Sequence, residues 1–378
     1  MQVVGDSSIA EPDGLTTGAG QRLIHELIEI GAITPDRVAA GLCVIGAWRR
    51  GRVWFVRTPN GPSYVVKQAS DPTGQRLLAR EAVVYSHLRG VERCHGPFLP
   101  ELTRYDEQRG LLIIDYVDGA SLGDIITRRG RARTTPAAVL GRTLARVHQA
   151  GIEQVDPSLN ITEPPWVLSI HRPDLRWHTH SSEASLEMHA EIQQRPELTS
   201  ALDRLRGELT ATALIHADLK LEHVIASRAP SRMRPAISII DWELAQLGDP
   251  AWDIGAIFAE YLLRWLRSIP LVAGRMPVEL AAIASTPLQR VQPSVNAFWQ
   301  AYAREAALDN ATRRRLRLRA TRSAAAILIQ RQEEQLQSVT APNGRTSLIL
   351  QMSNNIFTQP EAAAAVLLGL DGEPGGAT

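Results

Sequence analysis

Strand-like and helix-like segments occupy different parts of this chain, and their separation restricts the folds that it can adopt. The later part has apolar residues at helical spacing over most of its length. The apolar and β-branched runs lie almost entirely in the first third, at residues 42–48, 53–57, 63–67 and 110–117. Strands followed by helices favour an α+β fold with an antiparallel sheet. A length of 378 residues is enough for two lobes.

The pattern also predicts where the parts of the chain begin and end. We expect an N-terminal extension with a short helix at 1–34, a sheet-containing lobe at 35–117, a helical lobe at 118–371 and a disordered tail at 372–378. Asn60-Gly61 between two strand-like runs predicts a hairpin turn. Helices are expected at 75–89, 136–149, 185–210, 252–266, 296–307, 313–337 and 360–368.

Composition excludes several classes of protein. Hydrophobic residues make up 44% and charged residues 21%, and the formal net charge of +1 gives no reason to expect a nucleic-acid or membrane partner. No signal peptide or membrane-spanning run is visible. Cys43 and Cys94 lie far apart, without the spacing of metal ligands, and suit a reducing compartment. We therefore expect a cytoplasmic protein.

Two short β-like runs interrupt the helical part, and each leads into a carboxylate. The runs at 213–216 and 237–240 are followed by Asp218 and Asp241. Phosphoryl transfer needs cations on the phosphates, metal-binding oxygens and a carboxylate beside the acceptor hydroxyl. Lys67 ends a strand-like run, and Glu81 on the next predicted helix is placed to pair with it. A lysine at a strand end is by itself more often merely solvated.

The motifs resemble the aminoglycoside phosphotransferase branch of the kinase-like fold. His216-Ala217-Asp218 matches the His-Gly-Asp loop of that family, and Asp241-Trp242 matches its metal motif. The resemblance runs from Lys67 to Tyr302 and includes the segment 248–253. It implies a bilobal protein-kinase-like fold, with a small antiparallel β-sheet N-lobe and a larger, mainly helical C-lobe. It also implies an ATP-dependent O-phosphotransferase.

The resemblance assigns roles on the acceptor and metal side. Asp218 would be the catalytic base for the acceptor hydroxyl, and Lys220 would neutralise the transferring phosphoryl group. His223 and Asp241 would hold Mg2+, with Mn2+ as an alternative. Asp253 would be a buried carboxylate that holds the catalytic loop, beneath which His216 packs.

On the nucleotide side, Lys67 paired with Glu81 would contact the α- and β-phosphates of ATP. The backbone of a hinge would meet the adenine, at Asp115, Tyr116 and Val117.

The chain departs from the family pattern at three places. His223 stands where most relatives carry Asn, which leaves an inactive or altered kinase open. The macrolide phosphotransferases are similar to this chain in having His at this place, which favours an active enzyme, and Glu222 or Glu243 could add an oxygen ligand. A Gly-rich phosphate loop is missing, and the segment 49–52 (Arg-Arg-Gly-Arg) is either a polar turn or a phosphate contact. Lys220 follows the Asp by two positions, as in protein kinases, which favours a peptide hydroxyl as acceptor.

The segment 164–174 and the C-terminal pattern at 348–370 are similar to the phosphotransferase subunits of class V lanthipeptide synthetases. That resemblance implies Ser or Thr of a ribosomally made precursor peptide as acceptor, and a separate lyase as partner. The alternatives are an aminoglycoside or macrolide kinase, and a non-catalytic pseudokinase scaffold. The sequence leaves the acceptor, nucleotide preference, number of metals, oligomeric state and need for a partner open.

Two further groups of charged residues have competing interpretations. The arginines between 313 and 322 predict either a solvated helix face or a dock for an acidic leader peptide. His178 and His180 lack further ligands, so we interpret them as part of a polar loop rather than a metal site.

Overall fold

The computed structural model describes residues 18–49, 51–59, 61–90, 98–129, 134–150, 159, 162–172, 181–227, 237–270, 283–337, 339 and 344–370. Its contacts separate two compact units. The first comprises residues 1–124, 155–159 and 222–245, and the second comprises 125–154, 160–221 and 246–378. The expected tail at 372–378 and the first 17 residues of the expected extension lie outside the described residues, and the lobe boundaries stay predictions.

The first unit is built on a five-stranded antiparallel sheet with the order β1-β2-β3-β5-β4. Its strands are β1 (Cys43–Arg49), β2 (Gly51–Arg57), β3 (Tyr64–Gln68), β4 (Leu102–Asp106) and β5 (Leu111–Asp115). The four predicted strands are therefore confirmed. Strand β4 was not predicted, because it is an edge strand with no fully buried residue and hence no apolar alternation.

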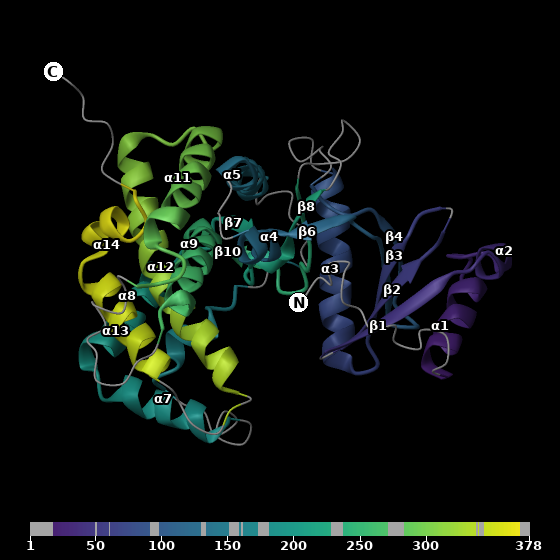
Figure 1. The fold of residues 1–378 in the computed structure, drawn as a ribbon, viewed down its shortest axis with the longest axis horizontal. Helices are drawn as coiled ribbons and strands as arrows, with labels where there is room; N and C mark the ends of the chain where they lie inside the picture. The colour runs from purple at the N-terminus through teal and green to yellow at the C-terminus, as the bar shows by residue number, and fades with distance from the viewer. Residues whose placement is uncertain are drawn as a thin grey trace. The chain divides into compact units, whose positions relative to one another are not determined.

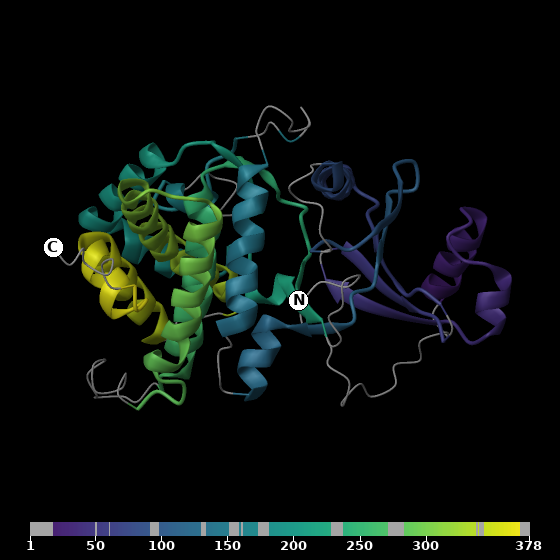
Figure 2. The ribbon, with the colours of Figure 1, turned by 90° about the horizontal axis from the view of Figure 1, so that it is seen from above.

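Helices lie on the two faces of this sheet, as both ribbon views show (Figures 1 and 2). The predicted N-terminal helix is α1 (Gly18–Glu29), which is followed by α2 (Pro35–Ala39). Leu23 and Leu27 of α1 join a core with alternate residues of the strands, because side chains two apart in a strand share one face. Helix α3 (Pro72–Gly90) lies on the opposite face and carries Glu81.

A smaller sheet brings a distant part of the sequence into the first unit. It has the order β6-β8-β9, from β6 (Gly119–Ser121), β8 (Val224–Ser227) and β9 (Ile237–Ile239). The backbone N–H of Ile239 also donates to the carbonyl of Phe98 over 2.8 Å. Strand β9 therefore holds the residues that follow it, including Asp241, within the sheet-containing unit.

The second unit is mainly helical, with one short strand pair, β7 (Ala213–Ile215) and β10 (Gln246–Gly248). Helix α5 packs on α11, and α9 packs on α12. Beyond α4 (Leu122–Arg129) its helices are α5 (Thr134–Gln149), η4 (Trp166–Ser169), α7 (Glu183–Gln193), α8 (Pro196–Glu208), α9 (Pro250–Ser268), α11 (Leu288–Glu305), α12 (Asn310–Leu336), α13 (Gly344–Thr358) and α14 (Pro360–Val366).

The helix boundaries differ from the predicted ones in places. The single helix predicted at 185–210 is two helices, because Pro196 cannot continue a helix and instead starts α8. Helix α11 begins at Leu288, eight residues earlier than predicted, and contains Pro293. Helix α13 was not predicted. No helix among the described residues is long and apolar enough to cross a membrane.

The tight packing of α5 on α11 gives a first testable expectation. A Cβ added at Gly141 would lie 2.2 Å from the carbonyl oxygen of Phe298, so we expect Gly141→Ala to lower the free energy of unfolding by about 2 kcal/mol or more. Gly207 in α8 is the matched control, because a Cβ there meets nothing within 4 Å. Gly207→Ala should stabilise by about 0.5–1 kcal/mol. Denaturant unfolding of both variants measures the difference, and equal stabilities would contradict the close approach.

Candidate functional site

A buried lysine on the central strand of the sheet is held by two carboxylates. The Nζ atom of Lys67 on β3 donates to Glu81 on α3 over 2.9 Å and 2.7 Å, and to Asp241 Oδ1 over 2.5 Å. Lys67 is 8% exposed and Glu81 is fully buried. The hydroxyl of Tyr85, one turn along α3, also donates to Glu81 over 3.2 Å. The structure thus brings together three of the predicted site residues.

The charges around Lys67 keep its ammonium protonated. Burial by itself lowers the pKa of Lys67, but the carboxylates of Glu81 and Asp241 outweigh it and raise the pKa well above the ordinary value. Burial also raises the pKa of Tyr85, which stays a hydrogen-bond donor. Lys67 therefore keeps its positive charge at neutral pH, and the two carboxylates fix its position.

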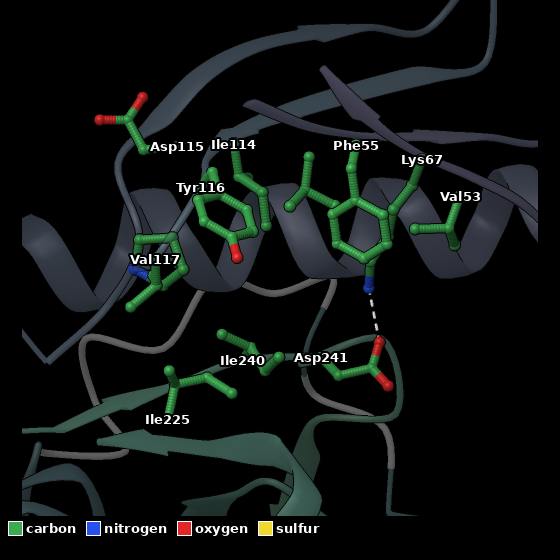
Figure 3. A pocket seen from close by; sticks show the side chains of 12 residues that line it. Val53, Phe55, Lys67, Ile114, Asp115, Tyr116, Val117, Ile225, Ile240 and Asp241 are labelled. Atoms are coloured by element: carbon green, nitrogen blue, oxygen red, sulfur yellow. Dashed lines mark hydrogen bonds and ion pairs between the residues drawn. The ribbon is translucent and has the colours of Figure 1, made fainter. Parts of the chain in front are cut away.

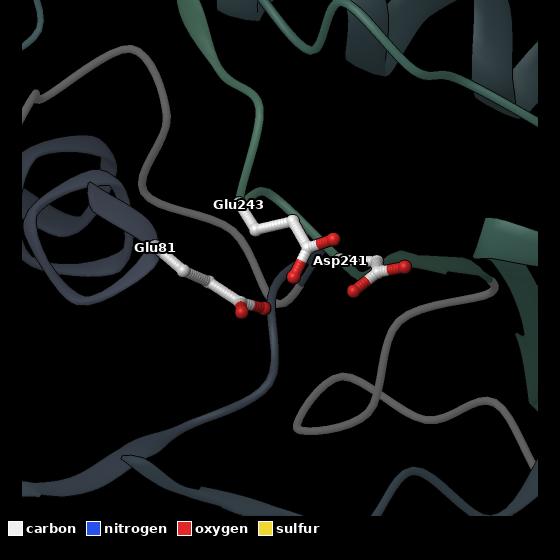
Figure 4. Close-up of side chains that lie close together, drawn as sticks. All are labelled: Glu81, Asp241 and Glu243. Atoms are coloured by element: carbon white, nitrogen blue, oxygen red, sulfur yellow. The ribbon is translucent and has the colours of Figure 1, made fainter. Parts of the chain in front are cut away.

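Asp241 and His223, the predicted metal ligands, lie beside this lysine. The second carboxylate oxygen of Asp241 is 3.3 Å from His223 Nε2. Asp241 has a φ of 71°, in the left-handed region that Asp tolerates better than most residues. Glu81, Asp241 and Glu243 each have an oxygen within 4.8 Å of the others (Figure 4). Oxygen donors of this kind suit Mg2+ or Mn2+, and the arrangement fits one such ion.

An apolar pocket in the first unit adjoins the lysine (Figure 3). Its walls include Val53, Phe55, Val65, Ile114, Val117, Ile225 and Ile240. The side chain of Asp115 points away from it and accepts a hydrogen bond from Thr103 over 3.1 Å. The pocket therefore offers hydrophobic surfaces to a flat apolar group next to a cation.

The predicted hinge forms one edge of this pocket. The backbone N–H groups of Asp115 and Tyr116 donate to the carbonyls of Glu101 and Ser63, each over 2.8 Å. Val117 has no hydrogen-bond partner for its backbone N–H within the described residues. Of the three predicted hinge residues, Val117 is therefore the one whose amide is available to a ligand.

A second charged cluster surrounds Asp218 in the second unit. Lys220 Nζ lies 3.0 Å from Asp218 Oδ2, and Arg331 of α12 donates from Nη1 to Asp218 Oδ1 over 2.8 Å. Arg331 is 5% exposed and also faces Glu334 and Glu260, at 2.9 Å and 3.5 Å. Burial opposes its charge, but the three carboxylates outweigh burial and raise the pKa of Arg331.

The fully buried Asp253 of α9 holds the loop that carries Asp218. Its carboxylate accepts from the backbone N–H groups of His216 over 2.7 Å and Ala217 over 3.0 Å. It also lies 3.2 Å from Nε2 of His148, whose Nδ1 is 2.9 Å from the hydroxyl of Tyr302. Because a carboxylate only accepts, Nε2 of His148 carries a proton. Ala217 has a φ of 65°, where the family pattern has glycine, and these contacts hold that strained conformation.

Several residues of these two clusters were not predicted from the sequence. Arg331 and Glu334 are three apart on a helix, which predicts only an exposed ion pair. Nothing in the sequence indicated that Glu260 and His148 are buried next to charged partners.

Three other groups of residues were singled out in the sequence: the arginines at 49–52, the histidines at 178 and 180, and the arginines of α12. The β1–β2 hairpin pairs Arg49 with Gly51, so it contains no long Gly-rich loop, but the side chains of Arg49, Arg50 and Arg52 lie outside the described residues. His178 and His180 also lie outside them. The arginines of α12 contact groups of their own chain: Arg313 with Gln300, Arg314 with Glu361, Arg315 with Thr312, Arg317 with Leu370, Arg319 with Asp249 and Arg322 with Glu208.

Comparison with known proteins agrees with this geometry. The profile of the phosphotransferase enzyme family (APH) matches residues 43–275, which is more than half of the chain. The matched range contains the Lys67 cluster and the Asp218 cluster, except for the residues of α12. The chain belongs to the phosphotransferase enzyme family. The predicted enzyme class, an O-phosphotransferase, is confirmed.

Solved structures with the same fold have low sequence identity to this phosphotransferase. The amicoumacin kinase hAmiN, in complex with AMP-PNP, Ca2+ and Ami, has a TM-score of 0.51 at 14% identity and covers 90% of this chain and 93% of its own. The GDP complex of aminoglycoside 2'-phosphotransferase-IIIa has a TM-score of 0.51 at 13% identity, with 90% and 99% coverage. They confirm the predicted kinase-like fold. No curated protein sequence shows a significant match.

Proposed function

We propose that this phosphotransferase transfers the γ-phosphate of ATP to a Ser or Thr hydroxyl of a ribosomally made precursor peptide, as a step before elimination. The observation that carries the phosphotransfer part is the Lys67 cluster. A buried, protonated lysine held by Glu81 and Asp241 borders an apolar pocket within one unit. An apolar slot next to a fixed cation suits a nucleotide, which has a flat base and charged phosphates.

The pocket residues have complementary roles in nucleotide binding. The amide of Val117 donates to the edge of the adenine, while Val65 and Ile240 cover its faces. Lys67 binds the phosphates, and Glu81 keeps its ammonium in place. Asp241, which contacts Lys67 here, would be the carboxylate that holds a divalent metal next to the phosphates.

A divalent metal fits the oxygen donors in this pocket. Asp241 and His223 hold it in this proposal, with Glu243 as the nearest additional oxygen. A bound Mg2+ or Mn2+ supplies positive charge that stabilises the phosphates during transfer. His223 is a less suitable ligand than Asn, so Glu243 is the residue that compensates for it.

The acceptor side is supported by the cluster around Asp218. Asp218 accepts the proton of the hydroxyl, and Lys220 neutralises the phosphoryl group as it moves. The segment that resembles lanthipeptide enzymes includes η4, which packs against α8 and α12 in the same unit as Asp218. Two cations, Lys220 and Arg331, contact the proposed base, so its carboxylate is already paired within the protein and does not require a cationic acceptor.

The second candidate acceptor is a small antibiotic. The amicoumacin kinase structure contains Ami, and the other structure is an aminoglycoside phosphotransferase, so a hydroxyl of such a molecule is the alternative outcome of the test. A non-catalytic scaffold is disfavoured, since Lys67, Asp218 and Asp241 would not all be needed for it.

Transfer of labelled phosphate from ATP tests the proposal. The native chain and Asp218→Asn are incubated with Mg2+ or Mn2+ and with precursor peptides encoded near the gene, aminoglycosides or macrolides. Mass spectrometry then identifies the acceptor that gains a phosphate. We expect a phosphorylated Ser or Thr in a peptide, and none with Asp218→Asn. A phosphorylated antibiotic would favour the alternative acceptor. The absence of nucleotide binding and turnover with either metal would contradict the proposal and favour the scaffold.

A further inference from the structure

Arg331 is a buried cation in direct contact with the proposed base, and the family motifs do not include it. Its Nη1 donates to Asp218 Oδ1 over 2.8 Å, and its Nη2 lies 3.4 Å from the carbonyl oxygen of the next residue, Leu219. One planar guanidinium therefore contacts both the side chain and the backbone of the Asp218 segment. Arg331 itself is held from two helices, by Glu334 of α12 and Glu260 of α9.

The two cations at Asp218 differ in their freedom to move. Arg331 is 5% exposed, whereas Lys220 is 24% exposed and contacts the other oxygen, Oδ2, at 3.0 Å. Glu334 offers Lys220 a second carboxylate, with Oε2 at 3.6 Å from Nζ. A base must have one oxygen accessible to the acceptor hydroxyl, so one cation has to leave when the acceptor binds. Lys220 is the one with an alternative partner and with access to solvent.

We propose that Arg331 is a positioning residue of this phosphotransferase. It holds Asp218 Oδ1, so that Oδ2 can receive the acceptor hydroxyl after Lys220 has moved from Oδ2 to Glu334. This inference rests on the proposed role of Asp218 as base. In the transfer step, the acceptor oxygen forms a bond to the γ-phosphorus and its proton moves to Asp218 Oδ2. The bond from the γ-phosphorus to the β–γ bridging oxygen breaks, and ADP leaves with the electron pair.

The geometry explains why a fixed guanidinium is useful here. A small misplacement of a reacting group costs about 100-fold in rate. Arginine donates in a rigid fork, whereas lysine offers a single ammonium on a flexible chain. A lysine at position 331 would keep the charge but lose the simultaneous contacts with Asp218 and the carbonyl of Leu219.

Four variants test the proposal: Arg331→Gln, Arg331→Lys, Glu334→Gln and, as a matched control on the same helix, Arg322→Gln. Arg322 pairs with Glu208 at 2.6 Å, away from Asp218. The kcat and the KM for ATP are measured with water and with the acceptor identified by the transfer assay. We expect kcat to fall about 100-fold for Arg331→Gln and about 10-fold for Arg331→Lys, with the KM for ATP within about twofold of native. Arg322→Gln should keep the native values.

The double variant Asp218→Asn/Arg331→Gln provides the readout that a merely structural role would not change. If Arg331 acts through Asp218, the double variant has the same residual kcat as Asp218→Asn alone. Multiplied losses, or an Arg331→Gln enzyme with kcat within threefold of native, would overturn the inference. Native activity in Asp218→Asn would instead refute the proposed base, and with it the proposed function.

Glu334→Gln keeps the test decisive if Arg331→Gln does not fold. That variant retains Arg331 but removes the charged alternative partner of Lys220, so we expect kcat to fall about 10-fold in a folded protein. Native kcat in a folded Glu334→Gln enzyme would overturn the exchange of Lys220. Nucleotide binding and the unfolding midpoint of each variant show which of them are folded.

Discussion

Replacement of Asp241 by Asn is expected to reduce phosphoryl transfer at least about 1000-fold, because the metal contributes several kcal/mol to the transition state. The carboxylate of Asp241 lies between Lys67 at 2.5 Å and His223 at 3.3 Å, so in the proposed function it serves both the phosphate and the metal side of the pocket. An amide in its place keeps the shape but loses the charge that a divalent ion needs. Steady-state kinetics at increasing concentrations of Mg2+ and Mn2+ measure the effect.

Two further variants accompany this one. Asp115→Asn is the matched control, because the Asp115 side chain points away from the pocket and bonds to Thr103, so activity should stay within about threefold of native. Glu243→Gln should raise the metal concentration for half-maximal rate about 10-fold if Glu243 completes the site. Activity of Asp241→Asn within tenfold of native would place the metal ligands elsewhere.

Replacement of Asp253 by Ala is expected to cause the largest loss of stability, about 3–5 kcal/mol. Asp253 is fully buried and is the common acceptor for the backbone of His216 and Ala217 and for the ring of His148. Without it, these donors are buried with no acceptor, and the positive φ of Ala217 loses its support. Asp253→Asn should also destabilise, since its NH2 group would face a backbone N–H. Denaturant unfolding gives the free energies.

Asp309→Ala provides the comparison for this stability prediction. Asp309 caps the N-terminus of α12 and accepts from the N–H of Thr312 over 2.8 Å, but it lies on the surface. Its loss should therefore destabilise the protein clearly less than the loss of Asp253. Similar losses for the two variants would show that the contacts of Asp253 contribute no more than an ordinary helix cap.

Much of the proposed nucleotide site could be predicted because its residues lie on elements that follow one another closely in the sequence. Lys67 ends a β-branched run, and Glu81 lies on the next helix, so their pairing follows from the order of the elements. The strand-like runs at 213–216 and 237–240 were recognised as β7 and β9 because buried strands are continuous apolar runs. Edge strand β4 and the break at Pro196 were missed or misplaced because their local patterns are weak.

The residues around Asp218 illustrate the opposite case. Arg331 is 113 positions from Asp218 in the chain, and His148 is 105 positions from Asp253. Their pairing depends on how α5, α9 and α12 pack and on where the loop that carries Asp218 lies against them. From the sequence alone, a charged residue on a helix is expected to be exposed to solvent. Only the structure shows that such a residue is buried next to an oppositely charged partner.

The sequence by itself indicated most of the strands and helices, though not β4 or α13, and the chemical groups proposed to act at Lys67, Asp218 and Asp241, because spacing and side-chain chemistry are local properties. The tertiary structure alone decided that Asp241 also holds Lys67, that His148 joins Asp253, and that a buried Arg331 contacts Asp218. These contacts join segments that are distant in the sequence. Their energies depend on burial and on the distance between charges, and both are set only when the helices and strands pack.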